Sequence, residues 1–416
     1  MWRLGGVLPL ESASLNEIAD FGEIVLLVAG GFSLALLGRT ITERLAIPSA
    51  ALFLLAAAVA SDLFPGLGEA ISFVTVERIA VVALIVILFD GGMNIGWRHA
   101  RASLVPILSL GVLGTFASAG LIAIAAHWML GFSWITSGLL GAALAPTDPA
   151  VMFSVLGGRE IRGRTGTILK GESGTNDPVG IALMIGIIEL ASSDEGSFWT
   201  VVTEFTVEMA GGAVIGVLGA AALVPLMHRA RLPEVSLYPL QVLAAGGVVY
   251  GAATLVHGSG FLAVFLAGLL IGDARAPRQE EIEGFHASLA SLAEITAFVA
   301  LGLTIDLSDV LSSGDWLDGL LLAALLGLLV RPLVVLLLLL PVRLDWGERL
   351  FVAWSGLKGA VPILLAALAV IAAVDDADRI YNVVFVVVLL SVVVQGSLLP
   401  AMARALRVPL HRVESR

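Results

Sequence analysis

The chain has 416 residues, of which 58% are hydrophobic and only 14% are charged, and its formal net charge is −11. Soluble globular domains carry roughly 25% charged residues, so this composition predicts that most of the chain is surrounded by lipid. The absence of cysteine excludes disulfides, thiolate metal sites and cysteine nucleophiles. The first residues lack the pattern of a cleaved signal peptide, so none is expected.

Apolar runs separated by short polar gaps follow one another along the chain. Runs of this length match helices that cross a hydrocarbon core of about 30 Å, and they lack the alternation of a β-barrel. We therefore expect an all-α polytopic membrane protein with about thirteen transmembrane segments. The expected segments are 21–38, 47–63, 79–97, 103–129, 134–157, 167–190, 201–227, 236–256, 259–272, 286–305, 316–340, 349–373 and 380–403.

The basic residues sort to one side of this arrangement. Of the 23 Lys and Arg residues, 18 fall on the side of the first loop between segments, and the opposite side holds Arg3, Arg78 and Arg379. A miscounted segment would move every later loop to the other side and destroy this sorting. The positive-inside rule then predicts a multi-pass inner-membrane protein with its N-terminus outside and its C-terminus in the cytoplasm.

Six ionisable residues are expected near the middle of the bilayer, in segments that are far apart in the sequence. A charge at that depth costs about 2.5–3.5 kcal/mol even on lenient insertion scales, so each of these residues is a functional candidate. Helices rise 1.5 Å per residue, which gives the six similar depths and predicts one polar site inside a helix bundle. They are Asp90, Asp148, Glu172, Asp177, Arg331 and Lys358.

Two segments are expected to be broken at their centres. The fifth contains Pro146 and Pro149, and the twelfth contains Gly356 and Gly359 with Pro362. Proline frees a backbone carbonyl, which at this depth must face protein or a water-filled cavity. The two segments lie seven spans apart and therefore run in opposite directions, as in transporters built from two inverted repeats.

A charged residue falls at each predicted break, Asp148 in the fifth segment and Lys358 in the twelfth. Half-helices that meet at such a break carry partial charges at their ends. An acid and a base at these positions can neutralise the opposed dipoles. We therefore assign Asp148 and Lys358 a structural electrostatic role rather than that of ion carriers.

The sixth segment carries the residues that suit ion exchange. Burial disfavours the charged form of a carboxylate, so Asp177 can hold either a proton or a partly dehydrated alkali cation, but not both. Ser173 lies one turn before Asp177 on the same helix face. Ser173, Thr147 and Asp90 offer further oxygen ligands, although Asp90 beside two glycines could instead cap a helix.

Arg331 lies in the eleventh segment, where an unpaired buried charge would destabilise the fold. We expect Glu172 to form an ion pair with it, and Asn176 to be its hydrogen-bonding partner. Glu294 in the tenth segment is open to two interpretations, a second titrating group or a residue that lines a cavity on the dimer side. Glu204 and Glu208 open the seventh segment, where acids are favoured by the helix dipole, and they receive no role.

Five motifs in this order resemble the monovalent cation:proton antiporters of the NhaP type, which are related to the sodium/proton exchangers. The resemblance covers nearly the whole chain and implies one transporter unit, residues 1–416. Within it, a core of crossed broken helices (103–190 and 316–403) would move like an elevator against a dimerisation domain (21–97 and 201–305). The motifs are Leu88-Phe89-Asp90-Gly91-Gly92, Ala145-Pro146-Thr147-Asp148-Pro149, Gly171-Glu172-Ser173-Gly174-Thr175-Asn176-Asp177-Pro178, Val330-Arg331-Pro332 and Gly356-Leu357-Lys358-Gly359-Ala360-Val361-Pro362.

The resemblance also implies roles for individual residues. Asp177 would carry the cation and the proton, Ser173, Thr147 and Asp90 would help to bind the cation, and Glu172, Asn176 and Arg331 would support the site. The pair Asn176-Asp177 is typical of electroneutral members that exchange one cation for one proton. The implied protein is a homodimeric Na+/H+ or K+/H+ antiporter with a role in pH homeostasis, not an enzyme, with no cofactor and no nucleic-acid partner.

Two departures from the usual pattern of the family bear on the choice of cation. Lys358 stands where an arginine is usual, so the charge is kept and the guanidinium geometry is lost. The motif around Asp177 also resembles a potassium/proton branch. The main alternative function is a sodium-coupled symporter of an organic anion on the same architecture, while a channel or an intramembrane aspartyl protease using Asp148 and Asp177 fits less well.

Overall fold

The computed structural model describes residues 48–64, 66, 71–156, 159–161, 163–192 and 198–412, together with positions 30, 31 and 33. Most of the expected first segment and both chain ends lie outside the described residues. The described helices are α2 (Ser49–Leu63), α4 (Phe73–Ile95), α5 (Trp97–Ala102), α6 (Leu104–Leu108), η1 (Ser109–Gly114), α7 (Thr115–Leu130), α8 (Trp134–Leu144), α9 (Pro149–Val155), α10 (Arg164–Ser192), α11 (Phe198–Arg229), α12 (Leu237–Leu255), α13 (Gly260–Ile271), α14 (Gln279–Leu303), α15 (Leu307–Ser313), α16 (Asp315–Leu325), η2 (Leu326–Val330), α17 (Arg331–Leu338), α18 (Trp346–Trp354), α19 (Ala360–Ile371), α20 (Ala377–Leu390), η3 (Ser391–Gly396) and α21 (Ser397–Ala405), and the strands are β1 (Arg159–Ile161) and β2 (Leu410–Arg412).

The helices follow the expected segments closely. Each segment from the second to the thirteenth coincides with one helix or with a run of consecutive helices. The total of thirteen stays a prediction, because the first segment lies outside the described residues. Among the described helices, 6 continuous stretches are long and apolar enough to cross a membrane: Leu104–Leu130, Trp199–Arg229, Leu237–Leu255, Gln279–Leu303, Asp315–Leu338 and Ala377–Ala405.

Two helices begin earlier than their apolar runs. Helix α4 starts at Phe73 rather than at 79, because the Ser72 side chain caps it by accepting a hydrogen bond from Thr75 N. Helix α14 starts at Gln279 rather than at 286, and Glu280 and Glu281 occupy its first turn, where the helix dipole favours acids. Polar residues therefore extend both helices beyond the apolar stretch.

Hydrogen bonds between distant loops support the alternation of sides. Arg98 N donates to Asp273 Oδ2 at 2.6 Å, and Thr165 Oγ1 donates to Glu348 Oε1 at 2.7 Å; all four residues fall on the predicted cytoplasmic side. On the opposite side, Ser308 Oγ donates to Asp62 Oδ2 at 2.9 Å. Arg379 Nη2 likewise donates to Leu130 O at 3.2 Å. Each bond joins two segments that the count assigns to one side.

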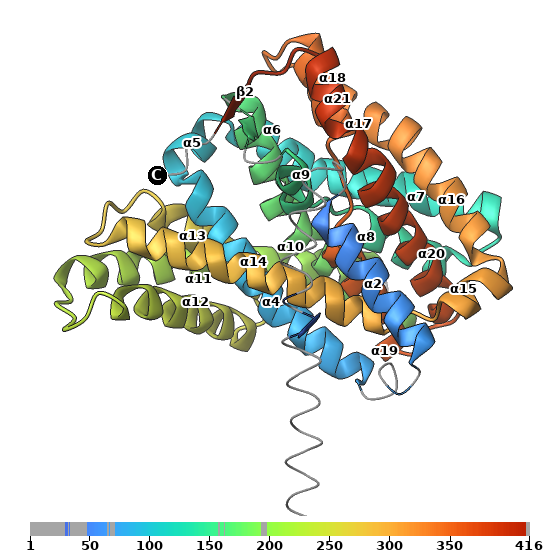
Figure 1. Ribbon diagram of the computed structural model, residues 1–416, viewed down its shortest axis with the longest axis horizontal. Coiled ribbons are helices and arrows are strands. Elements are labelled where there is room, and N and C mark those ends of the chain that lie inside the picture. The colour runs from blue at the N-terminus through green and yellow to red at the C-terminus, as the bar shows by residue number, and fades with distance from the viewer. Residues whose placement is uncertain are drawn as a thin grey trace, which may run out of the picture.

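The described helices form two groups with α10 between them (Figure 1). Helices α4 and α11–α14 pack together in one group, and α7, α8 and α16–α20 lie in the other, while α10 contacts α8 and α11. Glycines bring α4 and α13 close: a Cβ at Gly268 would overlap Phe89 O, and one at Gly272 would overlap Met93 O. The division into a core and a dimerisation domain stays a prediction.

The two predicted discontinuous helices are present. Helix α8 ends at Leu144 and α9 begins at Pro149, and α18 ends at Trp354 before α19 begins at Ala360. The breaks touch, because Asp148 N donates to Leu357 O at 2.8 Å. The inverted repeat that this arrangement suggests stays a prediction.

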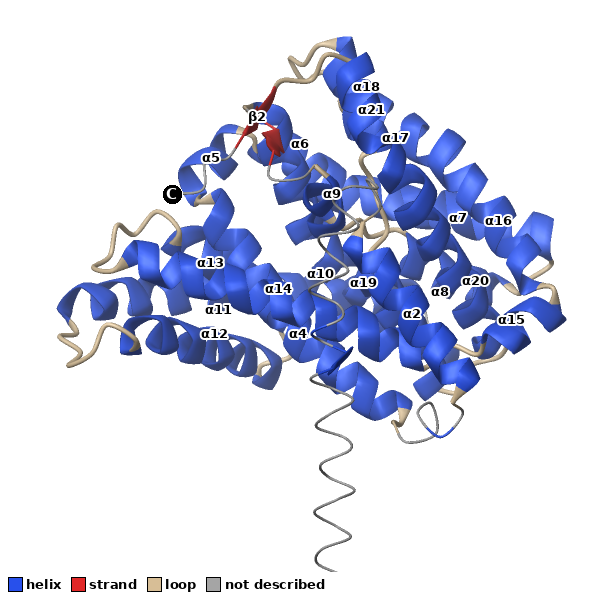
Figure 2. Ribbon diagram, in the orientation of Figure 1, coloured by secondary structure: helices blue, strands red, loops and turns tan. Residues whose placement is uncertain are grey.

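A small sheet departs from the expected all-α fold (Figure 2). Strand β1, between α9 and α10, pairs antiparallel with β2 near the C-terminus, with Ile161 opposite Leu410. Strands of three residues are too short to show an alternating pattern, and their pairing joins segments that are far apart in the sequence. The sheet connects the last described residues to the loop that leads into α10.

Candidate cation site

Helix α10 holds a group of buried polar side chains. Glu172, Ser173, Asn176 and Asp177 are between 1% and 5% exposed. The prediction that they face the bundle interior rather than lipid is therefore confirmed. Pro178 lies inside this helix and cannot donate to the carbonyl four residues before it, which belongs to Gly174. The polar side chains and this carbonyl occupy the same stretch of α10.

Glu172 and Arg331 form the predicted ion pair. Arg331 Nη2 donates to Glu172 Oε2 at 3.0 Å, and Nη1 bonds to the other carboxylate oxygen, so the pair is bidentate. The guanidinium lies against Gly356 in the break before α19, where a Cβ would overlap it. Both oxygens of the Glu172 carboxylate are therefore bonded to Arg331.

Asn176 has a different partner from the one expected. Its Nδ2 donates to Thr147 Oγ1 at 2.8 Å rather than supporting Arg331. The break after α8 places Thr147 beside α10, a position that the spacing along the sequence could not reveal. Asn176 Oδ1 and Asp177 Oδ1 are buried and make no hydrogen bond within the described part of the chain. Burying an oxygen without a hydrogen-bond partner destabilises the folded state unless a proton or a cation binds that oxygen.

Lys358 and Asp148 lie at opposite half-helix ends, as dipole compensation requires. Lys358 Nζ donates to Ala145 O at 3.0 Å and to Pro146 O at 2.8 Å, directly after α8 ends. The Asp148 carboxylate lies against Gly359, directly before α19 begins, where a Cβ would overlap it. Both charged groups also act electrostatically on Asp177. Lys358 is therefore the basic group recorded within electrostatic range of the Asp177 carboxylate, and Glu172 and Arg331 also act on Lys358.

Asp90 lies on α4, five residues before the helix ends at Ile95. Its place among the cation ligands stays a prediction. Its Oδ2 accepts a hydrogen bond from Asn94 Nδ2 at 2.8 Å, and Lys170 and Glu283 lie within electrostatic range. In the described part of the chain no hydrogen bond joins Asp90 to Thr147, Ser173 or Asp177.

Two residues without a predicted role hold the second break. Ser391 Oγ accepts a hydrogen bond from Lys358 N at 3.0 Å and donates to Gln395 Oε1 at 3.0 Å. Gln395 Nε2 in turn donates to Trp354 O, at the end of α18. Their spacing of four residues within the otherwise apolar last segment was the available signal.

Three helices of the bundle change to π-helical geometry near these residues. Segment η2 ends directly before Arg331, and η3 contains Ser391 and Gln395. In η1, Gly111 approaches α10 so closely that a Cβ would overlap the side chain of Thr175. Such π segments are frequent at functional sites, because they redirect side chains without ending the helix.

Comparison with known families decides the assignment. The family model described as "Sodium/hydrogen exchanger, transmembrane" matches residues 32–405. The chain belongs to this family. The sodium/hydrogen exchangers are monovalent cation:proton antiporters, so this chain is a membrane transporter and not an enzyme.

Curated relatives of the exchanger include proteins named for two different cations. The K+/H+ antiporter NhaP of Alkalimonas amylolytica is 35% identical over 93% of this chain and 67% of its own length. The K+/H+ antiporter NhaP2 of Shewanella sp. strain ANA-3 is 33% identical over 96% of this chain and 69% of its own length. The Na+/H+ antiporter NhaH of Halobacillus aidingensis is 26% identical, over 90% of this chain and 95% of its own length.

A solved structure shares the fold of this exchanger. The sodium proton antiporter MjNhaP1 from Methanocaldococcus jannaschii, at pH 8, superimposes with a TM-score of 0.78 and 24% sequence identity. The match covers 93% of this chain and 99% of that one. The α-helical membrane-antiporter fold is therefore established by both sequence and structure.

Proposed function

We propose that this exchanger moves one monovalent cation, Na+ or K+, against one proton across the cytoplasmic membrane by alternating access. The observation that carries the proposal is Asp177, which is 5% exposed and has a buried oxygen without a hydrogen-bond partner in the described residues. A carboxylate in this state must bind a proton or a cation to avoid an uncompensated charge in the membrane. Competition between the two for one group is sufficient for exchange.

The same arrangement supports an electroneutral cycle. Glu172 is neutralised by Arg331, and the charges of Asp148 and Lys358 are opposite and lie at facing breaks. Only Asp177 is left to change its bound species. If it returns with a proton after carrying a monovalent cation, the translocated site carries the same charge in both directions.

The proposed cation ligands are the oxygens that surround Asp177 on α10 and in the first break. Ser173 lies one turn away on the same face, and the Thr147 hydroxyl is oriented by Asn176. The Gly174 carbonyl, which has no helical donor because of Pro178, is a further candidate. The proposed site rests on these groups rather than on Asp90, for which no supporting contact is present in the described residues.

The proposed movement follows from the two groups of helices. The core, 103–190 and 316–403, holds Asp177 and both breaks, and we propose that it moves against 21–97 and 201–305, which form the homodimer contact. The charge distribution supports an outside N-terminus and a cytoplasmic C-terminus. The names of the more similar curated relatives make K+ the first cation to test.

Proton flux in proteoliposomes tests the proposed function. Purified exchanger is reconstituted with a pH-sensitive dye, and Na+, K+, Li+ and Rb+ are added in turn, with empty liposomes as the control. Exchange is expected with at least one cation, and the rate is expected to be insensitive to a membrane potential imposed with an ionophore. No response to any cation from folded protein would exclude antiport, and a potential-dependent rate would exclude the one-for-one cycle.

A further inference from the structure

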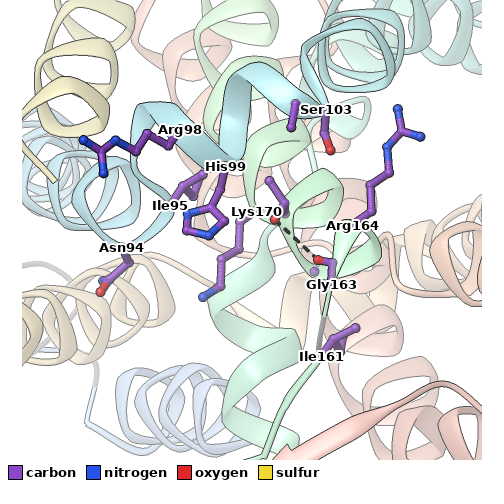
Figure 3. Close-up of a pocket in the computed structure, with 12 residues that line it drawn as sticks. Asn94, Ile95, Arg98, His99, Ser103, Ile161, Gly163, Arg164 and Lys170 are labelled. Carbon is purple, nitrogen blue, oxygen red and sulfur yellow. Dashed lines mark hydrogen bonds between the residues drawn. The ribbon is translucent and has the colours of Figure 1, made fainter. Parts of the chain in front are cut away.

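A basic cavity opens on the predicted cytoplasmic face, away from Asp177. Its volume is about 610 Å³, and its walls come from the end of α4, from α5, from Ser103 and from the segment that leads from β1 into α10. The lining contains Arg98, His99, Arg164 and Lys170, and within the described part of the chain it contains no Asp or Glu. In Figure 3, His99 and Lys170 lie near one another, with Arg98 and Arg164 on opposite sides of them.

Two acids bonded to lining residues of this basic cavity are already engaged. Asp273 Oδ2 accepts a hydrogen bond from the backbone N of Arg98 at 2.6 Å. Asp90 accepts one from Asn94 and lies within electrostatic range of Lys170. Three permanently charged basic side chains therefore line the cavity, and no acidic residue lines it among the residues that the structure describes, so the cavity disfavours a transported cation.

Neutral donors complete the lining. Gly166 belongs to the first turn of α10, where backbone N–H groups lack helical acceptors and the dipole favours negative charge. Thr167 also lines the cavity, but its backbone N–H donates to Gly163 O at 3.4 Å. Asn94 and Ser103 add an amide and a hydroxyl from the other walls. Charged and neutral donors from several elements therefore line this cavity, and such groups suit the acceptor oxygens of a phosphate group.

We propose that this cavity binds a phosphate-bearing anion, either a free phosphate compound or the headgroup of an anionic lipid. The anion would join Arg98 on α5 to Arg164 and Lys170 on α10. These residues stand on opposite sides of the boundary between the dimerisation group and the core. If the core moves as proposed above, a bound anion connects the moving part to the static part and slows exchange.

Binding is measured on the purified full chain by calorimetric titration, separately from transport. The first probe is inorganic pyrophosphate, with sodium chloride at matched ionic strength as the control for screening. The second is short-chain phosphatidic acid, with short-chain phosphatidylcholine as its control. Saturable binding of pyrophosphate identifies a free anion as a ligand, and saturable binding of phosphatidic acid alone identifies a lipid headgroup.

Paired substitutions locate the site. Arg98→Gln together with Arg164→Gln is expected to weaken binding by roughly tenfold or more, since two charge-assisted contacts are lost. Arg231→Gln together with Arg343→Gln removes two exposed arginines from the same face outside the cavity, and the affinity is expected to stay unchanged. Lys170→Gln gives an independent test if the first pair does not fold.

The proposal is overturned if neither probe binds saturably, or if the cavity variants bind as tightly as the unaltered chain. A second readout concerns regulation and rests on the proposed function. The anion that binds is expected to slow exchange in the unaltered protein and not in the Arg98→Gln, Arg164→Gln variant. Binding of the anion without any exchange activity would support the anion site and contradict the antiport proposal.

Discussion

Glu172 and Arg331 form a buried ion pair next to Asp177, the residue that we propose to carry the cation and the proton. Both side chains are almost fully buried, at 1% and 6% exposed, and the pair is bidentate. A buried ion pair adds little to stability compared with two apolar residues, but removing one partner leaves an unpaired buried charge. The pair therefore acts as a fixed support beside Asp177.

Breaking this pair is expected to destabilise the protein. Glu172→Gln or Arg331→Ala is predicted to cost about 3–5 kcal/mol, measured as a lower Tm in detergent. Glu281→Gln breaks the exposed Arg278–Glu281 pair and serves as the control, for which Tm is expected to stay unchanged. Equal Tm values for all these variants would remove the structural role of the buried pair.

Thr147 offers a test of cation binding that keeps the fold. Thr147→Val preserves the shape but removes the hydroxyl that accepts from Asn176, so the half-saturating cation concentration is expected to rise about tenfold. Thr147→Ser retains the hydroxyl and should stay close to the unaltered protein. Exchange by the valine variant with normal cation affinity would show that Thr147 is not a ligand.

At the scale of elements, the contact between the two breaks organises the site. Lys358 binds the carbonyls that end α8, and Asp148 lies where α19 begins, so each half-helix end meets a charge of opposite sign. Ser391 and Gln395 in η3 fix the backbone from the other side. The site therefore depends on segments that are more than two hundred residues apart.

A glycine substitution probes this contact. Gly359→Ala places a Cβ onto the Asp148 carboxylate and is expected to lower both Tm and the exchange rate. Gly120→Ala is the matched control, because nothing lies within 4 Å of the added Cβ in α7. Alanine favours a helix over glycine by about 1 kcal/mol, so the control should be neutral or slightly stabilised. A Gly359→Ala variant with normal Tm and exchange rate would contradict the close contact at the breaks.

The sequence predicted the helices and the buried charged residues better than it predicted which residues and strands pair with one another. Proline and glycine near mid-segment indicated both breaks, and the cost of an unpaired Arg331 indicated its pairing with Glu172. The partner of Asn176 and the β1–β2 pair depend on contacts between distant segments, which periodicity does not encode. The early start of α4 depends on the polar Ser72 cap, which lies outside the apolar run from which the helix was predicted.

At the scale of the whole molecule, charge sorting and loop contacts give the same arrangement of sides. The chain contains no cysteine, so single cysteines can report topology directly. Cysteines at the exposed positions 231 and 343 are expected to react with an impermeant maleimide only from the cytoplasmic side, and those at 312 and 375 only from outside. Labelling of all four positions from one side would contradict the topology.

The central claim is that Asp177 alone carries both the cation and the proton. The most direct measurement is cation-driven proton flux in proteoliposomes containing Asp177→Asn, beside the unaltered protein, over a range of pH. Asparagine cannot ionise, so no flux is expected with Na+ or K+ at any pH, while Tm and the elution volume show that the variant is folded. Exchange by Asp177→Asn at a normal rate would contradict the assignment of Asp177 as the carrier and would show that another residue carries the cation and the proton.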